Sequence, residues 1–374
     1  MGSHGKVMNR PYTFYGWHAS YFAGKARTYL HYKQVPVLEP TLTLWTLMGP
    51  VKRHTGAAAM PALRTPTGQW LSDSSEIIDH IEAAFPQRPV VPQTPVQRCV
   101  SYLLEAWFDE WWVPMAMHSR WSYPENYRDL FRRDVGNQLM PGFPRLAKNI
   151  AVDYVAGMLR GMCPAVGIRP EQLSWLNSWS EHALDLLHTH LKAQPYLLGS
   201  RPSLADFAMA GPMYGHLGRD PWPAREWIEP RPALRQWTDH MAQPPERAAE
   251  GELLPDDQIP ATLVPLLQLV LSEFTPFVQG IQAQVQALAA TWPPGKTLPR
   301  GLADVCVSTP QGQFCRTALP YTLWMVQRLQ NVFASLTLAE QTRVRLAFAS
   351  WGSDELLSLT VPKLERRALR VALV

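Results

Sequence analysis

Several polar side chains stand where predicted helices begin, which is where a protein can stabilise an anion. Ser20 comes shortly before a predicted helix over residues 24–33, and Asp73 and Ser74 lie at the start of another over residues 74–84. The first turn of a helix leaves backbone N–H groups unpaired and carries the positive end of the helix dipole. A hydroxyl or N–H group placed there favours a bound thiolate or carboxylate. The same residues also suit plain N-caps, so the local pattern leaves both roles open.

Short strands and helices alternate around these residues. Residues 11–17 and 35–42 are predicted strands on either side of the first helix, and an ill-defined stretch over 43–56 follows. Residues 60–63 and 68–71 are predicted as two short strands joined by a turn, before the second helix. This order, β-α-β-(α)-β-β-α within about 75 residues, is that of a thioredoxin-like unit.

Three motifs within this unit resemble those of the glutathione S-transferase superfamily. They are SYFAGKAR at 20–27, with Ser20 seven residues before an arginine, MPAL at 60–63, and LSDSSEII at 71–78. The first is closest in pattern to the serine and cysteine classes such as tau, zeta and omega. Farther on, LLGSRPSLADFAMA at 197–210 resembles the helix start of that family's all-helical domain. The resemblance spans roughly residues 12–245.

The resemblance implies an α/β thioredoxin-like N-terminal domain followed by an all-α C-terminal domain. We expect the first over residues 11–85, where it would bind glutathione, and the second over 96–245, after a proline-rich linker. Residues 246–374 form an atypical C-terminal extension, predicted to be mostly helical with a β-hairpin near 303–317. No family pattern indicates what this extension does.

The resemblance also implies a role for each motif residue. Ser20 would donate its hydroxyl to the glutathione sulfur and stabilise the thiolate. Met60 would pair with the cysteinyl backbone like an added strand, next to a cis peptide bond at Pro61. Asp73 would receive the α-ammonium group, and Ser74 the γ-glutamyl carboxylate.

Neighbouring side chains remain alternatives for two of these roles. Lys52 is our assignment for the glycyl carboxylate of glutathione, in a stretch that departs from the family pattern. Other residues that could fill one or the other role are Arg53, His54, Tyr15, Tyr21 and His18.

A side-chain stripe on the predicted long helix over 96–121 also has two interpretations. Trp107, Trp111, Met115 and His118 recur at helical spacing. Such a stripe lines either the pocket for the second substrate or the core. By contrast, Ser203 and Asp206 form a capping box with a structural role.

These residues predict a glutathione-dependent transferase that acts on a hydrophobic electrophilic small molecule. Glutathione-dependent isomerisation, ether cleavage or dehalogenation is an alternative, and so is a non-catalytic binding or scaffold protein with the same fold. A homodimer is expected from the resemblance.

Composition narrows the remaining classes of function. The net charge is only +4, with no run of five basic residues, which argues against nucleic-acid binding. No stretch approaches 18 consecutive apolar residues, so we expect no membrane span. The four cysteines show no CxxC motif and no metal-ligand spacing, so we expect no metal site and a reducing, cytoplasmic location.

Two of the cysteines belong to the predicted hairpin. If its turn centres on Pro310 and Gln311, Cys306 lies directly opposite Cys315. In a reducing location we expect two adjacent free thiols rather than a disulfide.

Overall fold

The computed structural model describes residues 11–243 and 246–374. Its N-terminal part is the thioredoxin-like unit that the sequence predicts, with a four-stranded sheet in the order β2-β1-β3-β4. Strand β1 is parallel to β2 and antiparallel to β3, which is antiparallel to β4. The elements of this part are β1 (Tyr12–Tyr15), α1 (Tyr21–Lys33), β2 (Val37–Leu38), α2 (Leu44–Thr46), η1 (Leu47–Val51), α3 (Lys52–Thr55), β3 (Ala62–Arg64), β4 (Trp70–Ser72) and α4 (Ser74–Ala84).

The stretch over 43–56, which the sequence left undefined, is helical. Thr43 begins it as an N-cap, because its hydroxyl accepts a hydrogen bond from the Thr46 backbone N–H at 3.2 Å. Pro50 lacks an N–H group and lies inside the π-helical turn η1. The broken hydrogen-bond pattern around Pro50 explains why the sequence showed no regular helix there.

The second part of the chain is all-helical, as predicted. Its elements are α5 (Pro95–Trp111), α6 (Val113–Trp121), η2 (Asn126–Phe131), α7 (Arg132–Leu139), α8 (Arg145–Gly161), η3 (Pro170–Gln172), α9 (Leu173–Ala193), α10 (Leu204–Pro212), η4 (Met213–Leu217), α11 (Pro221–Pro223), η5 (Ala224–Ile228) and α12 (Pro232–Ala242). The prediction of one long helix over 96–121 is wrong, since the helix breaks at Trp112, two residues before Pro114. The capping box of Ser203 and Asp206 is confirmed at the start of α10.

The C-terminal part is helical with two hairpins, of which only the first was predicted. Its elements are η6 (Glu246–Ala249), η7 (Pro255–Asp257), η8 (Ala261–Leu263), α13 (Val264–Ala289), β5 (Asp304–Thr309), β6 (Gly312–Thr317), α14 (Pro320–Ala334), α15 (Leu338–Trp351), α16 (Glu355–Ser358), β7 (Leu364–Arg367) and β8 (Arg370–Leu373).

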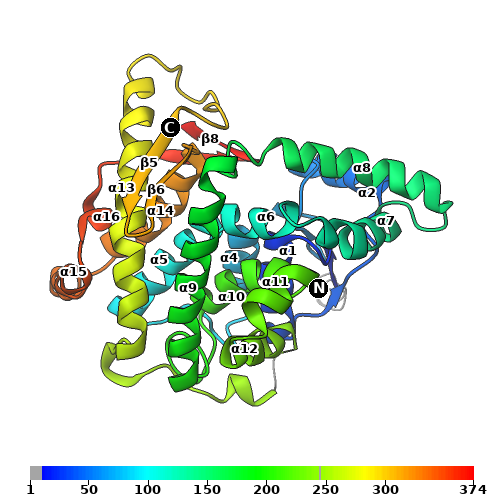
Figure 1. Cartoon of the computed structure of the whole chain (residues 1–374). Helices are drawn as coiled ribbons and strands as arrows, with labels where there is room; N and C mark the ends of the chain where they lie inside the picture. Colours follow the sequence, from blue (N-terminus) through cyan, green and yellow to red (C-terminus); the bar gives the residue numbers. More distant parts are fainter. Residues whose placement is uncertain (1–10, 244–245) are drawn as a thin grey trace, which may run out of the picture.

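The extension does not pack as a separate body. Helix α5 contacts α10 on one side and α13, α14 and α15 of the extension on another. One continuous cluster of buried side chains therefore runs from Tyr12 in the N-terminal part to Leu373 in β8. Figure 1 shows α13 running beside α9 along much of its length. Because this core is shared, the extension is part of the fold that positions the site.

Helix α13 is strongly apolar. The segment 261–289 is long and apolar enough to cross a membrane, with a mean hydropathy of 1.5 over an 18-residue stretch. Polar residues interrupt the segment, so it contains no unbroken apolar run of that length. In the structure 61% of that stretch is buried inside the protein. The segment packs as a core helix.

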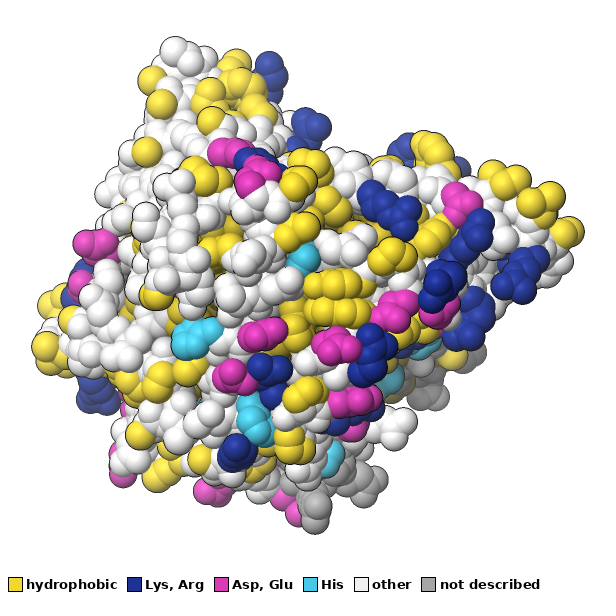
Figure 2. All heavy atoms as spheres, in the orientation of Figure 1, with side chains coloured by type: hydrophobic (Ala, Val, Ile, Leu, Met, Phe, Trp, Pro, Cys, Tyr) yellow, Lys and Arg dark blue, Asp and Glu magenta, His cyan; other side chains and the backbone are white. Residues whose placement is uncertain are grey.

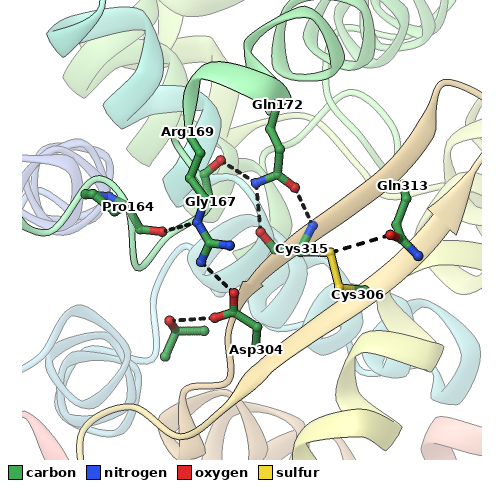
Figure 3. The surroundings of a disulfide bond; sticks show 9 residues. Pro164, Gly167, Arg169, Gln172, Asp304, Cys306, Gln313 and Cys315 are labelled. Atoms are coloured by element: carbon green, nitrogen blue, oxygen red, sulfur yellow. Dashed lines mark hydrogen bonds and ion pairs between the residues drawn. A yellow bond between two sulfur atoms is a disulfide. The ribbon is translucent and has the colours of Figure 1, made fainter.

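The predicted hairpin and its register are confirmed. Cys306 pairs with Cys315 and Thr309 with Gly312. The expectation of free thiols is wrong, because the two sulfur atoms form a disulfide (Figure 3). Directly opposed side chains on one face of an antiparallel pair come close enough for such a bond.

Helices α7 and α8 project from the body as an arm (Figure 1). One face of α8 carries an exposed apolar stripe at helical spacing, formed by Leu146, Ile150, Tyr154 and Met158. Figure 2 shows apolar and basic side chains together on this arm.

A buried acid in α13 makes stability depend on pH. Burial raises the pKa of Glu273 to about 7, although its carboxyl accepts a hydrogen bond from the Trp179 indole N–H at 2.6 Å. As pH rises from about 4.5, the unfolded chain loses this proton first, so stability falls until the folded-state pKa is reached.

Glu273→Gln keeps an oxygen acceptor for Trp179 and removes the titration. We expect it to shrink the loss of unfolding free energy between pH 5 and pH 8 by about 2–3 kcal/mol, measured by urea denaturation. The exposed Glu171→Gln is the control and should leave the pH dependence as it is. An unchanged slope in Glu273→Gln would contradict the prediction.

Candidate functional site

A single cavity of about 410 Å³ is lined by residues from all three parts of the chain. The N-terminal part contributes Ser20, Met60, Pro61 and Asp73 among others. Its apolar wall comes from the helical part, where the lining residues include Val113, Met117, Trp121, Phe131, Leu159, Met162 and Val166. The extension covers the cavity with residues that include Arg300, Arg316, Tyr321, Arg366 and Arg370.

Ser20 is half-buried at the cavity and caps the start of α1. Its hydroxyl oxygen accepts a hydrogen bond from the Ala23 N–H at 3.4 Å. Among the described residues none accepts the hydroxyl proton, which is therefore free for a ligand. The two interpretations of Ser20, cap and hydroxyl donor, are thus compatible.

The loop before Ser20 is held by a buried arginine of α6. Arg120 donates to the carbonyl of Ala19 at 2.6 Å and to that of Gly215 at 2.9 Å. Its charge is balanced by a two-pronged ion pair with Asp220, at 2.7 and 3.0 Å. This network fixes the Ala19 backbone, and so positions the serine that follows it.

The alternative hydroxyl donors are placed less well. The Tyr21 hydroxyl donates to the Phe108 carbonyl at 2.5 Å, and burial raises the pKa of Tyr21 well above its usual value. Tyr15 stacks on Trp70 and is not among the residues that line the cavity. His18 is exposed and does not line it either. Ser20 is the candidate that the geometry favours.

Met60 and Pro61 line the same cavity as Ser20. The peptide bond between them is cis, which confirms that prediction. The Met60 sulfur accepts a hydrogen bond from the Trp17 N–H at 3.4 Å. Both Met60 and Trp17 line the cavity, so the two segments form one continuous surface.

Asp73 and Ser74 lie at the start of α4, but Asp73 is already engaged. One carboxylate oxygen caps the helix by accepting from the Ser75 N–H at 2.8 Å, and the other accepts from the Tyr321 hydroxyl at 2.6 Å. Ser74 is buried, and its hydroxyl has no partner among the described residues. Asp73 lines the cavity, whereas Ser74 is not among the lining residues.

Lys52 is not among the residues that line the cavity. It is exposed on α3, and the cavity is lined instead by Thr55, Ala57 and Ala59 from the following residues. Arg53 and His54 are exposed as well. The cations that do line the cavity come from α6 and from the extension.

Three acids on one face of α4 attach the extension to the N-terminal part. Asp73 accepts from Tyr321, Glu76 forms a two-pronged ion pair with Arg366, and Asp79 one with Arg328. Acids three residues apart share a helix face, so α4 presents them together. The extension is thereby anchored beside the segment that carries Asp73 and Ser74.

A second group of charges lies beneath the cavity, where α1 meets α5. The Lys25 ammonium group contacts Glu105 at 2.8 Å and Asp109 at 2.5 Å, and all three side chains are buried. Burial and the charge of Glu105 raise the pKa of Asp109, although Lys25 opposes this. Asp109 and its neighbour Glu110 both line the cavity.

The tryptophan stripe of α5 and α6 belongs to the core. Trp107, Trp111 and Met115 are fully buried and are not among the lining residues. His118 bonds to Ser122 and Asn177. The pocket interpretation of this stripe is therefore wrong, because the opposite side of the helix faces the cavity.

Sequence reasoning missed Asp109, Glu110 and every lining residue of the extension. The two acids could have been noticed in the sequence, because adjacent carboxylates interrupt an aromatic stretch of a predicted helix (residues 107–112, WFDEWW). For the arginines of the extension the sequence holds no such indication, because only tertiary packing brings them to the cavity. Within residues 11–243 and 246–374 no group of His, Cys, Asp and Glu side chains is arranged to hold a metal ion.

Two family models match the chain. Residues 14–89 match the glutathione S-transferase N-terminal domain, and residues 180–240 match the glutathione S-transferase C-terminal domain. No curated protein matches the chain.

Similar solved structures are distant in sequence. They include a glutathione S-transferase from Rhodospirillum rubrum F11 (17% identity, 67% of this chain and 96% of that one, TM-score 0.40). Another is the beta-etherase LigF from Sphingobium sp. strain SYK-6 (18% identity, 64% of this chain and 98% of that one, TM-score 0.44). A third is a glutathione S-transferase of Ceriporiopsis subvermispora in complex with glutathione (18% identity, 66% of this chain and 100% of that one, TM-score 0.41).

The two family matches follow one another in the order of the two domains seen in the structure, and residues 241–374 lie beyond both. Residues 14–89 and 180–240 of this chain are therefore similar to the N-terminal and the C-terminal domain of glutathione S-transferases, in that order.

Proposed function

We propose that this protein is a glutathione-dependent transferase in which Ser20 stabilises the glutathione thiolate for attack on a hydrophobic electrophile. The observation that carries the proposal is the shared cavity. Ser20, Met60–Pro61 and Asp73 line it together with apolar residues of the helical part. The pattern around Ser20 favours the serine and cysteine classes.

Ionising the glutathione thiol near neutral pH requires only modest stabilisation of the thiolate. A free thiol has a pKa of about 8.5, and only the thiolate attacks. Lowering that pKa by about two units takes roughly 2.7 kcal/mol, at about 1.36 kcal/mol per unit. One hydrogen bond from the Ser20 hydroxyl to a charged sulfur supplies about 1.5–3 kcal/mol, and the helix start at α1 adds to it.

Glutathione binding and thiol ionisation test the proposal together. Binding is measured by titration calorimetry, and ionisation by the ultraviolet absorbance of the thiolate as pH is raised. We expect bound glutathione to ionise about two pH units below free glutathione. Absence of glutathione binding would overturn the proposal.

A non-catalytic protein with the same fold is the second candidate, and one contact favours it by occupying a group that the catalytic site needs. The carboxylate of Asp73 that would receive the α-ammonium group of glutathione already accepts hydrogen bonds from Tyr321 and from the start of α4. Glutathione that binds but keeps its ordinary thiol pKa would identify this function. Isomerisation, ether cleavage or dehalogenation would use the same thiolate, and product analysis separates them from conjugation. The homodimer and the cytoplasmic location remain predictions.

A further inference from the structure

The extension supplies only cations to the charged lining of the cavity. Its ionisable lining side chains, apart from Tyr321, are Arg300, Arg316, Arg366 and Arg370. Arg366 is neutralised by Glu76, while Arg300 and Arg370 are exposed. Arg316 differs from the other three because it is only 1% exposed.

Arg316 is a buried cation whose hydrogen bonds are incomplete. One guanidinium nitrogen donates to the backbone carbonyl of Glu110 at 2.7 Å, and the guanidinium lies 5.1 Å from the centre of the Phe277 ring. Its Nε has no partner among the described residues, and no described carboxylate forms an ion pair with it. Burial lowers the pKa of Arg316 to about 10, although the nearby Glu110 carboxylate opposes this, so the group stays charged at neutral pH. A buried cation that lines a cavity and keeps an unpaired N–H donor is suited to bind an anionic ligand.

The strand that carries Arg316 is held firmly. The side-chain amide of Gln172 acts like a short extra strand, donating to the Cys315 carbonyl at 2.9 Å and accepting from the Cys315 N–H at 2.6 Å (Figure 3). Phe314 stacks on Trp175 at 4.1 Å, and the Cys306–Cys315 disulfide joins the two strands. A side chain on so rigid a strand is preorganised for a ligand.

Arg316 is linked to the apolar lining of the cavity through its strand and through Glu110. The next residue, Thr317, donates its N–H to the Ala165 carbonyl at 2.8 Å, beside the lining residue Val166. Glu110, whose carbonyl Arg316 contacts, is one turn before the lining residue Val113. In contrast, Tyr321 and Arg366 are the extension residues that contact the segment 72–76.

We propose that Arg316 binds a carboxylate of the hydrophobic second substrate, so that the extension selects anionic acceptors. This inference rests on the proposed function, because it assigns the acceptor side of a glutathione site. A planar guanidinium with free N–H groups matches a carboxylate in geometry and charge. The apolar wall would hold the rest of the acceptor.

Two ligands of the same shape test the proposal without turnover. Naphthalene-2-carboxylate and naphthalene-2-carboxamide are titrated calorimetrically into the full chain, with and without glutathione. We expect the wild-type protein to bind the carboxylate at least tenfold more tightly than the amide. Arg316→Met should abolish that preference and leave amide binding within twofold. Arg316→Lys should retain part of the preference, since lysine keeps the positive charge but lacks the paired N–H donors of the guanidinium.

Arg367→Met is the matched control, because Arg367 is an exposed arginine at the end of β7 that does not line the cavity. Circular dichroism checks that each variant folds. If Arg316→Met does not fold, the comparison of the two ligands on the wild-type protein still tests the proposal. Equal wild-type affinity for the two ligands, or an undiminished preference in Arg316→Met, would overturn the proposal. A tenfold loss of glutathione affinity in Arg316→Met would also overturn it, by assigning Arg316 to glutathione. Failure of the proposed function looks different: glutathione does not bind, while the carboxylate preference persists.

Discussion

Replacing Lys25 by methionine is expected to lower the free energy of unfolding by about 3–5 kcal/mol, the cost of leaving a buried charge without its partner. Lys25 is fully buried and contacts two carboxylates of α5, Glu105 and Asp109, as well as the hydroxyl of Ser75 at 3.1 Å. Methionine has a similar length but cannot balance those charges. The contact joins α1, α4 and α5, so its loss weakens the junction between the two domains.

The loss should depend on pH. In Lys25→Met the two carboxylates no longer have their cation, and protonation relieves the charge that remains. We therefore expect a smaller loss at pH 5 than at pH 8, measured by urea denaturation at both values. Adding Asp109→Asn should recover part of the stability at pH 8.

Lys52→Met is the control for this prediction, since Lys52 is exposed on α3. Surface substitutions of that kind usually change stability by no more than about 0.5 kcal/mol. A Lys25→Met protein as stable as the Lys52→Met protein would show that the buried cluster contributes nothing to the fold.

Ser20→Ala is expected to reduce turnover by about 10- to 1000-fold while glutathione affinity changes little. The hydroxyl proton of Ser20 has no acceptor among the described residues, and the side chain lines the cavity beside Met60 and Pro61. Its hydrogen bond to sulfur strengthens as the thiolate forms, so the loss should appear in kcat and in the thiol pKa rather than in binding. Steady-state kinetics with an aryl halide acceptor measures it.

The substitution also removes an N-cap, which by itself costs about 0.5–2 kcal/mol of stability. Thr337→Ala is the matched control, because Thr337 caps α15 by accepting from the Glu340 N–H at 3.4 Å and does not line the cavity. It should lower stability similarly and leave turnover unchanged. Equal turnover in Ser20→Ala and wild type would remove Ser20 from the mechanism.

The sequence by itself determined the local elements of the thioredoxin-like unit and of the first hairpin. Apolar periodicity over Ile77, Ile78 and Ile81 predicts α4, and all three side chains are fully buried. The turn at Pro310 and Gln311 sets the register of its own strands, because a hairpin pairs residues in order outward from the turn. These features depend on residues close together in the chain, so their signals are contained in short windows.

What only the tertiary structure decided is how distant segments meet at the cavity. Arg316 and Arg366 are separated from Asp73 by more than two hundred residues, and no periodicity relates them. The same holds for the burial of α13 and for the disulfide, since a pairing register places two sulfur atoms together but does not fix their oxidation state. The face of a helix that lines a cavity is likewise set by what packs on its other faces. Core packing of α5 against the extension buries Trp107 and Trp111 and leaves Asp109 and Glu110 for the site.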